Sequence, residues 1–238
     1  MKFLDIIESA KSVSALIETK TEESTALLQS QVNALLDRIR ELPPDHDPQE
    51  RAQMLLDTAR NLILLEEGAQ AWAPAREAFD IYVAAQNWEK AVECCDALYL
   101  SGHSDALIAL GQGVWLAVTF PVNPELSVAL LEHVVDDTPD DSDGAAVAAI
   151  TAHYVADVRS NTDQQRENLT FFTGQLLAKV ARRHSEIDSQ TKFDWWLNKL
   201  ELNDPALFLP RLRNVVDVLV QDQWWIDRDA IRASLPVN

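Results

Sequence analysis

Two histidines in this sequence stand four residues before an aspartate, a spacing that could bind a metal ion. The pairs are His133 with Asp137 and His153 with Asp157. Residues four apart lie on one face of a helix, so each pair would offer one imidazole and one carboxylate to the same ion. A helical bundle that joined both pairs would hold two imidazoles and two carboxylates. Because solvated or hydrogen-bonded pairs with this spacing are common in acidic helical proteins, we predict no metal site and no cofactor.

Residues suited to nucleophilic catalysis give little support for an enzyme. Cys94 and Cys95 are adjacent, so their side chains diverge on a helix and do not face each other. Lys90, one turn earlier, is slender support for a thiol of lowered pKa. We interpret both cysteines as small packing residues. Gly111-Gln112-Gly113 lacks the third glycine and the preceding strand of a dinucleotide-binding loop. We predict no catalytic residue and no enzymatic activity.

The charge of the chain disfavours nucleic acid and anionic membranes as partners. The formal net charge is -18 and the pI is near 4.5, so the average field repels phosphate groups. Four interpretations of this charge stay open. It would keep the protein soluble, attract a basic protein partner, imitate nucleic acid and occupy a basic groove, or reflect a saline habitat.

The expected location is the cytoplasm. Asp5 and Glu8 interrupt what would have to be the apolar core of a secretory signal. The sequence contains no run of about eighteen uncharged apolar residues, which is the length needed to span a membrane. The two adjacent cysteines form no disulfide framework, which fits a reducing compartment.

Apolar residues recur at spacings of three and four along most of the chain, which predicts helices. Six glycines in 238 residues are few for a sheet protein, and no segment alternates apolar and polar residues for long enough to predict a sheet. The fold class is therefore all-α. Pro48 and Pro124 suit the first turns of their helices. The expected helices cover about residues 48–67, 74–85, 88–100, 104–120, 124–134, 145–159, 164–185, 192–200 and 205–220, with a short turn at 227–234.

Residues 1–45 are expected to form a helical hairpin of their own. One apolar stripe runs from Phe3 to Ile17, and a polar break follows at residues 20–25. A second helix carries a heptad-like seam and ends at two prolines. This seam could support a homodimer. Its residues are Leu28, Val32, Leu35, Ile39 and Leu42.

The helices expected between Pro74 and Ser101 carry a recognisable pattern. Tyr82 lies in the first helix, Trp88 opens the second, and Ala91 is a small residue where the two helices would cross. This pattern resembles a tetratricopeptide repeat. The sequence departs from the repeat in having Phe79 where the family usually has glycine, and Cys95 in place of the second-helix aromatic.

The resemblance implies antiparallel helical hairpins over residues 46–190, stacked as a tetratricopeptide-like array or α-solenoid. Two later helix pairs match the repeat in length without its signature, so a non-repetitive helical bundle is the alternative. Residues 191–238 would follow as a tryptophan-rich helical segment. By analogy with helical repeats, we expect a protein–protein interaction module: an adaptor, an assembly factor or a subunit of a larger complex. The alternatives are an acidic nucleic-acid mimic and a helical-bundle metal protein or enzyme.

Two tryptophan doublets, Trp195-Trp196 and Trp224-Trp225, are the candidate partner-binding residues. Adjacent side chains on a helix diverge, so at most one member of each doublet can sit in the middle of a single core. Tryptophan is enriched at interface hot spots because it buries a large rigid area. In the alternative, both doublets close the end of the helical array, as terminal segments do in stacked repeats.

Overall fold

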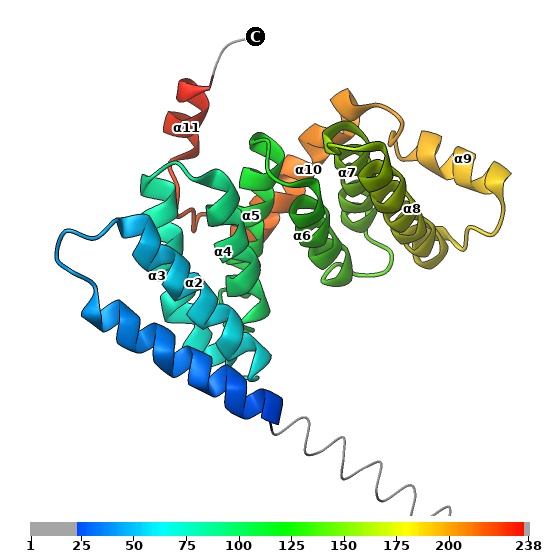
Figure 1. Ribbon diagram of the computed structural model, residues 1–238. Helices are drawn as coiled ribbons and strands as arrows, with labels where there is room; N and C mark the ends of the chain where they lie inside the picture. Colours follow the sequence, from blue (N-terminus) through cyan, green and yellow to red (C-terminus); the bar gives the residue numbers. More distant parts are fainter. Residues whose placement is uncertain (1–22, 236–238) are drawn as a thin grey trace, which may run out of the picture.

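The computed structural model describes residues 23–235, and all regular structure in that range is helical (Figure 1). The all-α fold class is therefore confirmed. Among the described residues, no helix combines the length and the apolar character needed to cross a membrane. The helices are residues 23–41, α2 (Pro48–Leu64), α3 (Gly68–Ala84), α4 (Trp88–Leu100), α5 (Ala106–Thr119), α6 (Pro124–Asp136), α7 (Asp143–Arg159), α8 (Asp163–Ser185), α9 (Gln190–Lys199), α10 (Pro205–Val220) and α11 (Arg228–Ser234).

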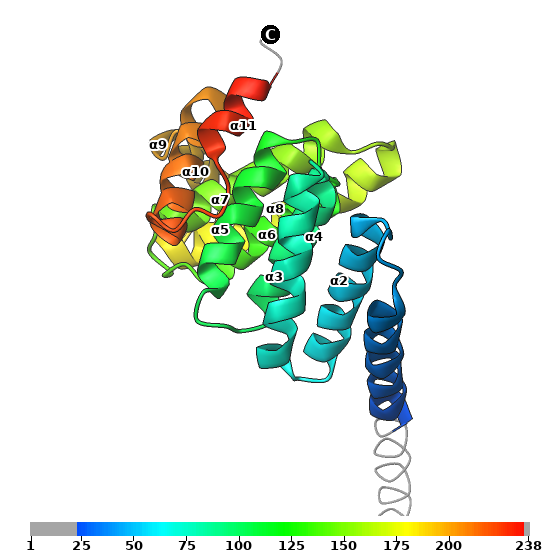
Figure 2. The same ribbon diagram turned by 90° about the vertical axis from the view of Figure 1, so that its left-hand side faces the viewer.

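The helices from α2 to α8 form an array in which each helix packs against the next one in the chain. The even-numbered helices also contact one another in order, α2 with α4, α4 with α6 and α6 with α8. By contrast, α3, α5 and α7 each lie against two of these even-numbered helices. The chain then turns back, and α10 packs against both α5 and α7 (Figure 2). Neighbouring helical pairs in an all-α array were predicted, whereas the return of α10 was not.

Proline and a capping side chain begin two of the helices where the sequence predicts. The side chain of Asp47 accepts a hydrogen bond from the backbone N–H of Gln49, and Pro48 opens α2. Asn123 and Pro124 do the same for α6. In both helices the capping side chain accepts a hydrogen bond from a backbone N–H that the first turn leaves free. Proline fits at this position because the first residues of a helix donate no hydrogen bond within it.

The expected start of α3 was wrong, because this helix begins at Gly68 rather than near Pro74. Pro74 lies inside the helix. A Cβ atom on Gly68 would lie 2.2 Å from the carbonyl oxygen of Ser101, so the glycine permits a close helix contact instead of marking a break. Ala71, Ala75 and Ala78 are fully buried along the same helix. The helix therefore continues through Pro74, supported by the good helix formers around it and by the packing of α3 between α2 and α4.

The pair α3–α4 docks antiparallel, as expected, because Gly68 at the start of α3 meets Ser101 at the end of α4. Tyr82 and Ala91 are buried in this pair. Trp88 has a different role: its ring stacks on Phe120 at 4.4 Å between centroids. Since Phe120 follows α5, Trp88 ties the pair to the next part of the array.

Two arginines close the ends of helices that lie two places earlier in the array. Arg159 at the end of α7 donates to three carbonyl oxygens between Ala117 and Phe120, at the end of α5, over 2.5 to 2.9 Å. Arg183 of α8 donates to the carbonyl oxygen of Val135 in α6 at 2.6 Å. The last carbonyls of a helix have no partner within it, so these guanidinium groups satisfy them and link alternate helices.

The expected N-terminal hairpin falls partly outside the described residues, since its first helix precedes residue 23. Residues 23–41 form the second helix. Val32 of the predicted seam is buried in the main core, and Leu36 and Ile39 pack against that core. Part of the surface considered for a homodimer is therefore covered by the chain itself. One continuous cluster of buried residues extends from Val32 to Ile226, so the described parts of all three expected segments share a core.

Two glycines offer a direct test of the packing. We expect Gly68→Ala to lower the free energy of unfolding by about 1–3 kcal/mol, because the new methyl group meets backbone that cannot move easily. Gly174→Ala in α8 is the matched control: a Cβ atom there meets nothing within 4 Å. That change should raise the free energy of unfolding by about 0.5–1 kcal/mol through helix propensity alone. Urea denaturation followed by circular dichroism measures both, and equal effects of the two changes would contradict the close contact at Gly68.

Candidate docking site on α8 and α9

The outward face of α8, at the far end of the array from α2, carries two exposed aromatic side chains. Phe171 is 69% exposed and Phe172 is 42% exposed. The opposite face of the helix is buried at Thr173, Leu176 and Val180, where α8 packs against α7. Exposed residues of this size are unusual beside a complete core, so the outward face of α8 is the main candidate for a binding surface.

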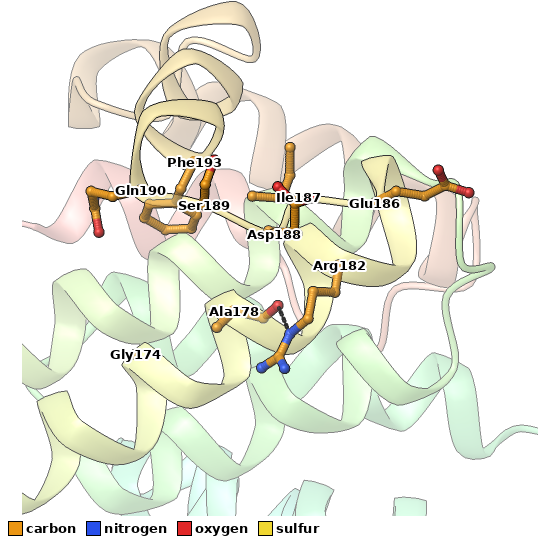
Figure 3. A pocket seen from close by; sticks show the side chains of 10 residues that line it. Gly174, Ala178, Arg182, Glu186, Ile187, Asp188, Ser189, Gln190 and Phe193 are labelled. Carbon is orange, nitrogen blue, oxygen red and sulfur yellow. Dashed lines mark hydrogen bonds between the residues drawn. The ribbon is translucent and has the colours of Figure 1, made fainter.

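A groove runs along this face and opens into a cleft between α8 and α9 (Figure 3). Two adjoining hollows of about 660 and 720 Å³ share Gly174, Ala178 and Arg182. Phe171 and Phe172 border the first hollow, and Phe193 borders the second. Because glycine and alanine present little side chain, another helix could approach the backbone of α8 closely at this point.

The turn after α8 shapes the cleft. Glu186 adopts the left-handed conformation with φ 52°, and its N–H bonds to the carbonyl oxygen of Arg182 at 2.9 Å. The next residue, Ile187, is buried in the core. The chain therefore reverses directly after α8, which leads it into α9 on the other side of the cleft.

Trp196 anchors α9 to the array. Its side chain is fully buried, and its Nε1–H donates to Nδ1 of His184 at 3.2 Å. Since indole nitrogen only donates, Nδ1 of His184 must accept, and the Nε2 proton of a neutral ring points to Asp143 at 3.1 Å. Arg211 of α10 also reaches Asp143, at 3.0 Å. This network joins α7, α8, α9 and α10 behind the cleft.

The structure separates the four tryptophans predicted to bind a partner. Trp195 is 56% exposed on α9, with the ammonium group of Lys199 4.9 Å from its ring, while Trp196 is buried. This division within one doublet agrees with the geometry of adjacent helical residues. Trp224 and Trp225 lie outside any helix, between α10 and α11, and are partly buried against α5 and α3. The two doublets therefore do not form one surface.

The histidine–aspartate pairs do not combine into a metal site among residues 23–235. His133 contacts Asp96 at 3.2 Å, whereas Nδ1 of His153 contacts the hydroxyl of Thr173 at 2.9 Å. Asp157 binds Arg166 instead of an imidazole. The described residues contain no group of three or more histidine, cysteine or acidic side chains that could hold an ion. Burial lowers the pKa of His153, so this ring is held neutral against Thr173.

The two cysteines lie in α4, and the side chains of both are packed in the core. Both are inaccessible to solvent, and burial raises the pKa of each thiol well above its ordinary value. Arg60 lies near enough to Cys94 to oppose this shift but does not reverse it. The thiols are thus protonated near neutral pH, as packing residues require and a nucleophile does not.

The residues that make the α8 surface were not among the sequence-based candidates. A signal for them was present: Phe171 and Phe172 are adjacent, so one helix cannot bury both on the stripe defined by Leu169, Leu176 and Val180. The same argument was applied to the tryptophan doublets. The openness around Gly174 depends on where the array ends, which the sequence pattern does not specify.

Comparison with known proteins assigns no family to this all-helical array. No family model matches the sequence, and no curated protein or solved structure matches the chain. The resemblance to a tetratricopeptide repeat therefore rests on the α3–α4 pair alone, and function has to be argued from the surface of the array.

The same substitution at the two tryptophans of α9 should change the free energy of unfolding by very different amounts. We expect Trp196→Ala to lower the free energy of unfolding by about 3–5 kcal/mol, because it leaves a cavity and removes the bond to His184. Trp195→Ala should change it by less than about 0.5 kcal/mol, since the ring is exposed. Chemical denaturation monitored by circular dichroism gives both values. A large loss for Trp195→Ala would show that this ring is buried in solution.

The thiols provide a test of the α4 core. At pH 8 a small aromatic disulfide reagent should modify Cys94 and Cys95 at least about 100-fold more slowly in the native protein than in urea, because burial limits both access and thiolate formation. Absorbance of the released thiol measures the rate. Fast release of one equivalent from native protein would contradict the placement of α4.

Proposed function

We propose that this protein is a protein–protein interaction module that binds its partner along the outward face of α8 and in the adjoining cleft. The observation that carries the proposal is the exposed pair Phe171 and Phe172 beside a groove floored by Gly174 and Ala178. Aromatic side chains next to a shallow apolar groove are typical of interface hot spots, where a large rigid area is buried.

The shape of the groove supports a helix as the bound element. Phe171, Gly174, Ala178 and Arg182 succeed one another at helical spacings along α8, so they form one straight stripe. A partner helix with an apolar stripe would pack its side chains against the phenylalanines and approach α8 closely at Gly174. The partner helix would then cover the outward face of α8, much as α6 and α8 cover the two sides of α7.

Charge defines the partner further. Among the described ion pairs none includes Arg182, whose guanidinium bonds to the carbonyl oxygen of Ala178 (Figure 3). An acidic side chain on the partner helix would pair with it. Elsewhere the net charge of -18 favours a partner that is basic overall, since opposite net charges accelerate encounter. We place this interaction in the cytoplasm, where the thiols of Cys94 and Cys95 need no oxidising compartment.

A second association, the homodimer expected from the N-terminal seam, has weaker support than the α8 surface. Val32 is 3% exposed and Ile39 packs on the core, so these two residues of the seam are covered by the chain itself. The experiment on α8 includes self-association as one of its outcomes.

The α8 surface can be tested with a double substitution and a matched control. We expect Phe171→Ser with Phe172→Ser to reduce recovery of the partner in affinity purification by at least about tenfold, the usual effect of losing an aromatic hot spot. Leu64→Ser is the control, because Leu64 is 67% exposed on α2 and lies at the other end of the array. Neither change should alter the free energy of unfolding by more than about 0.5 kcal/mol.

A photo-crosslinking residue at position 171 identifies what occupies the groove. A crosslink to another protein that disappears with a competing partner helix supports the proposal. Crosslinks between two copies of this chain, with dimers in sedimentation velocity, would show that the surface serves self-association instead. Equal partner recovery with the double variant and with Leu64→Ser would remove α8 from the interface.

A further inference from the structure

Residues 221–227 link α10 to α11 without regular secondary structure and lie against α5 and α3. The chain leaves α10 at Val220 and forms no helix until α11; in Figure 1 this linker is the coil drawn directly below α11. This segment is in contact with side chains more than a hundred positions earlier in the sequence, including Gln112. Its geometry is that of a short peptide bound to a helical surface.

Gln112 of α5 binds the backbone of this segment at two points. Its Nε2 donates to the carbonyl oxygen of Gln223 at 3.1 Å, and the N–H of Trp225 donates to its Oε1 at 3.3 Å. Gln112 is fully buried, so both ends of its amide depend on these partners. Because the bonds are made to main-chain atoms, they would hold a non-helical segment of another sequence equally well.

An aromatic pocket on α3 receives Trp225. Trp72 and Phe79 meet its ring edge-on, at 6.0 and 5.5 Å between centroids. The guanidinium of Arg76 lies over the same ring at 4.3 Å. These three residues share one face of α3, and together with Gln112 they suit a non-helical chain that carries an aromatic side chain.

The chain's own segment fits this surface imperfectly. Gln221, where it leaves α10, has φ 55° and ψ -122°, a conformation that favours glycine and is strained for glutamine. Trp224 packs edge-on against Trp115 of α5, at 6.3 Å between centroids, but its indole Nε1–H is buried without an acceptor among the described residues. Both features weaken the hold of the segment on the array.

We infer that the face formed by Trp72, Arg76, Phe79 and Gln112 is a second binding site, which takes a non-helical aromatic segment of a partner protein and is occupied here by residues 221–227 as a displaceable internal ligand. The partner segment resembles Gln223–Ile226 in carrying a bulky aromatic residue followed by an aliphatic one. A competitor that offers an acceptor to the site of Trp224, or that enters without a strained residue, binds in preference. This site is separate from the α8 surface and does not depend on it.

The experiment measures competition between the internal segment and an added one. The probe is a fluorescent synthetic peptide with the sequence of residues 221–235, and the protein is the full-length chain. Trp225→Ala weakens the internal segment and leaves the site intact, so this variant should bind the peptide at least about tenfold more tightly than the unaltered chain. Gln221→Gly relieves the strain, so it should bind the peptide about tenfold more weakly. Fluorescence polarisation gives the three dissociation constants.

Two controls locate the binding. Adding Gln112→Ala to Trp225→Ala should abolish the gain in affinity, because the backbone contacts are lost. Trp195→Ala, in the other doublet, should leave peptide binding unchanged. Equal affinity of the unaltered chain, Trp225→Ala and Gln221→Gly would overturn the inference, as would undetectable binding by all three. Exchange of peptide-equivalent segments between copies, seen as dimers of the unaltered chain, would overturn the assignment to a partner protein.

A second measurement avoids any loss of folding in Trp225→Ala. Hydrogen exchange at the Trp225 amide should be faster than at the amides of α5 in the unaltered chain, and about tenfold slower in Gln221→Gly than in the unaltered chain. Exchange as slow as that of α5, unchanged by Gln221→Gly, would show that the segment is a fixed part of the core.

Discussion

The structure depends on the enclosure of α5. Every residue from Ile108 to Ala117 is buried, so the middle of this helix has no face left for solvent, as expected at the centre of a core. Two neighbours approach it at glycines. A Cβ atom on Gly113 would lie 2.7 Å from that of Cys95 in α4, and one on Gly111 would lie 2.4 Å from a methyl group of Val220 in α10. Helices this close require the absence of a side chain, and the positions of α4 and α10 follow.

Much of this arrangement could be predicted from local signals, and the part that could not involves contacts between distant residues. Pro48 and Pro124 fixed two helix starts because proline acts on its own turn. The helix after residue 67 was expected to begin near Pro74, whereas it begins at Gly68, which contacts Ser101 closely in the packed pair. Gly111 and Gly113 looked like glycines in an ordinary helix, since nothing near them in the sequence shows that α10 returns. The role of Gln112 depends on residues 223–225 and was beyond any periodicity argument.

The candidate surfaces lie where the array ends or where its own chain covers it. Within residues 23–235 no further helical pair lies against the outward face of α8, and α9 covers only part of it, so Phe171 and Phe172 stay exposed. The inner aromatic residues of α3 are covered by the C-terminal segment. A doublet of bulky residues lies at each place: Phe171-Phe172 diverge because they are adjacent on a helix, whereas Trp224-Trp225 lie outside any helix and both pack against the core. Phe171-Phe172 was overlooked in favour of the tryptophans, of which only Trp195 is largely exposed.

The arginine closures have a consequence for synthesis of the chain. The carbonyl groups at the end of α5 wait for Arg159, and those at the end of α6 wait for Arg183, each supplied two helices later. The helix α10, which packs against α5 and α7, is synthesised later still. When α5 has left the ribosome, the nascent chain therefore carries an apolar helix whose later packing partners, including α10, have not yet been made. Packing of the core around α5 is therefore completed only after the later helices are made. Chains that terminate early would expose α5 and be candidates for chaperone binding and degradation.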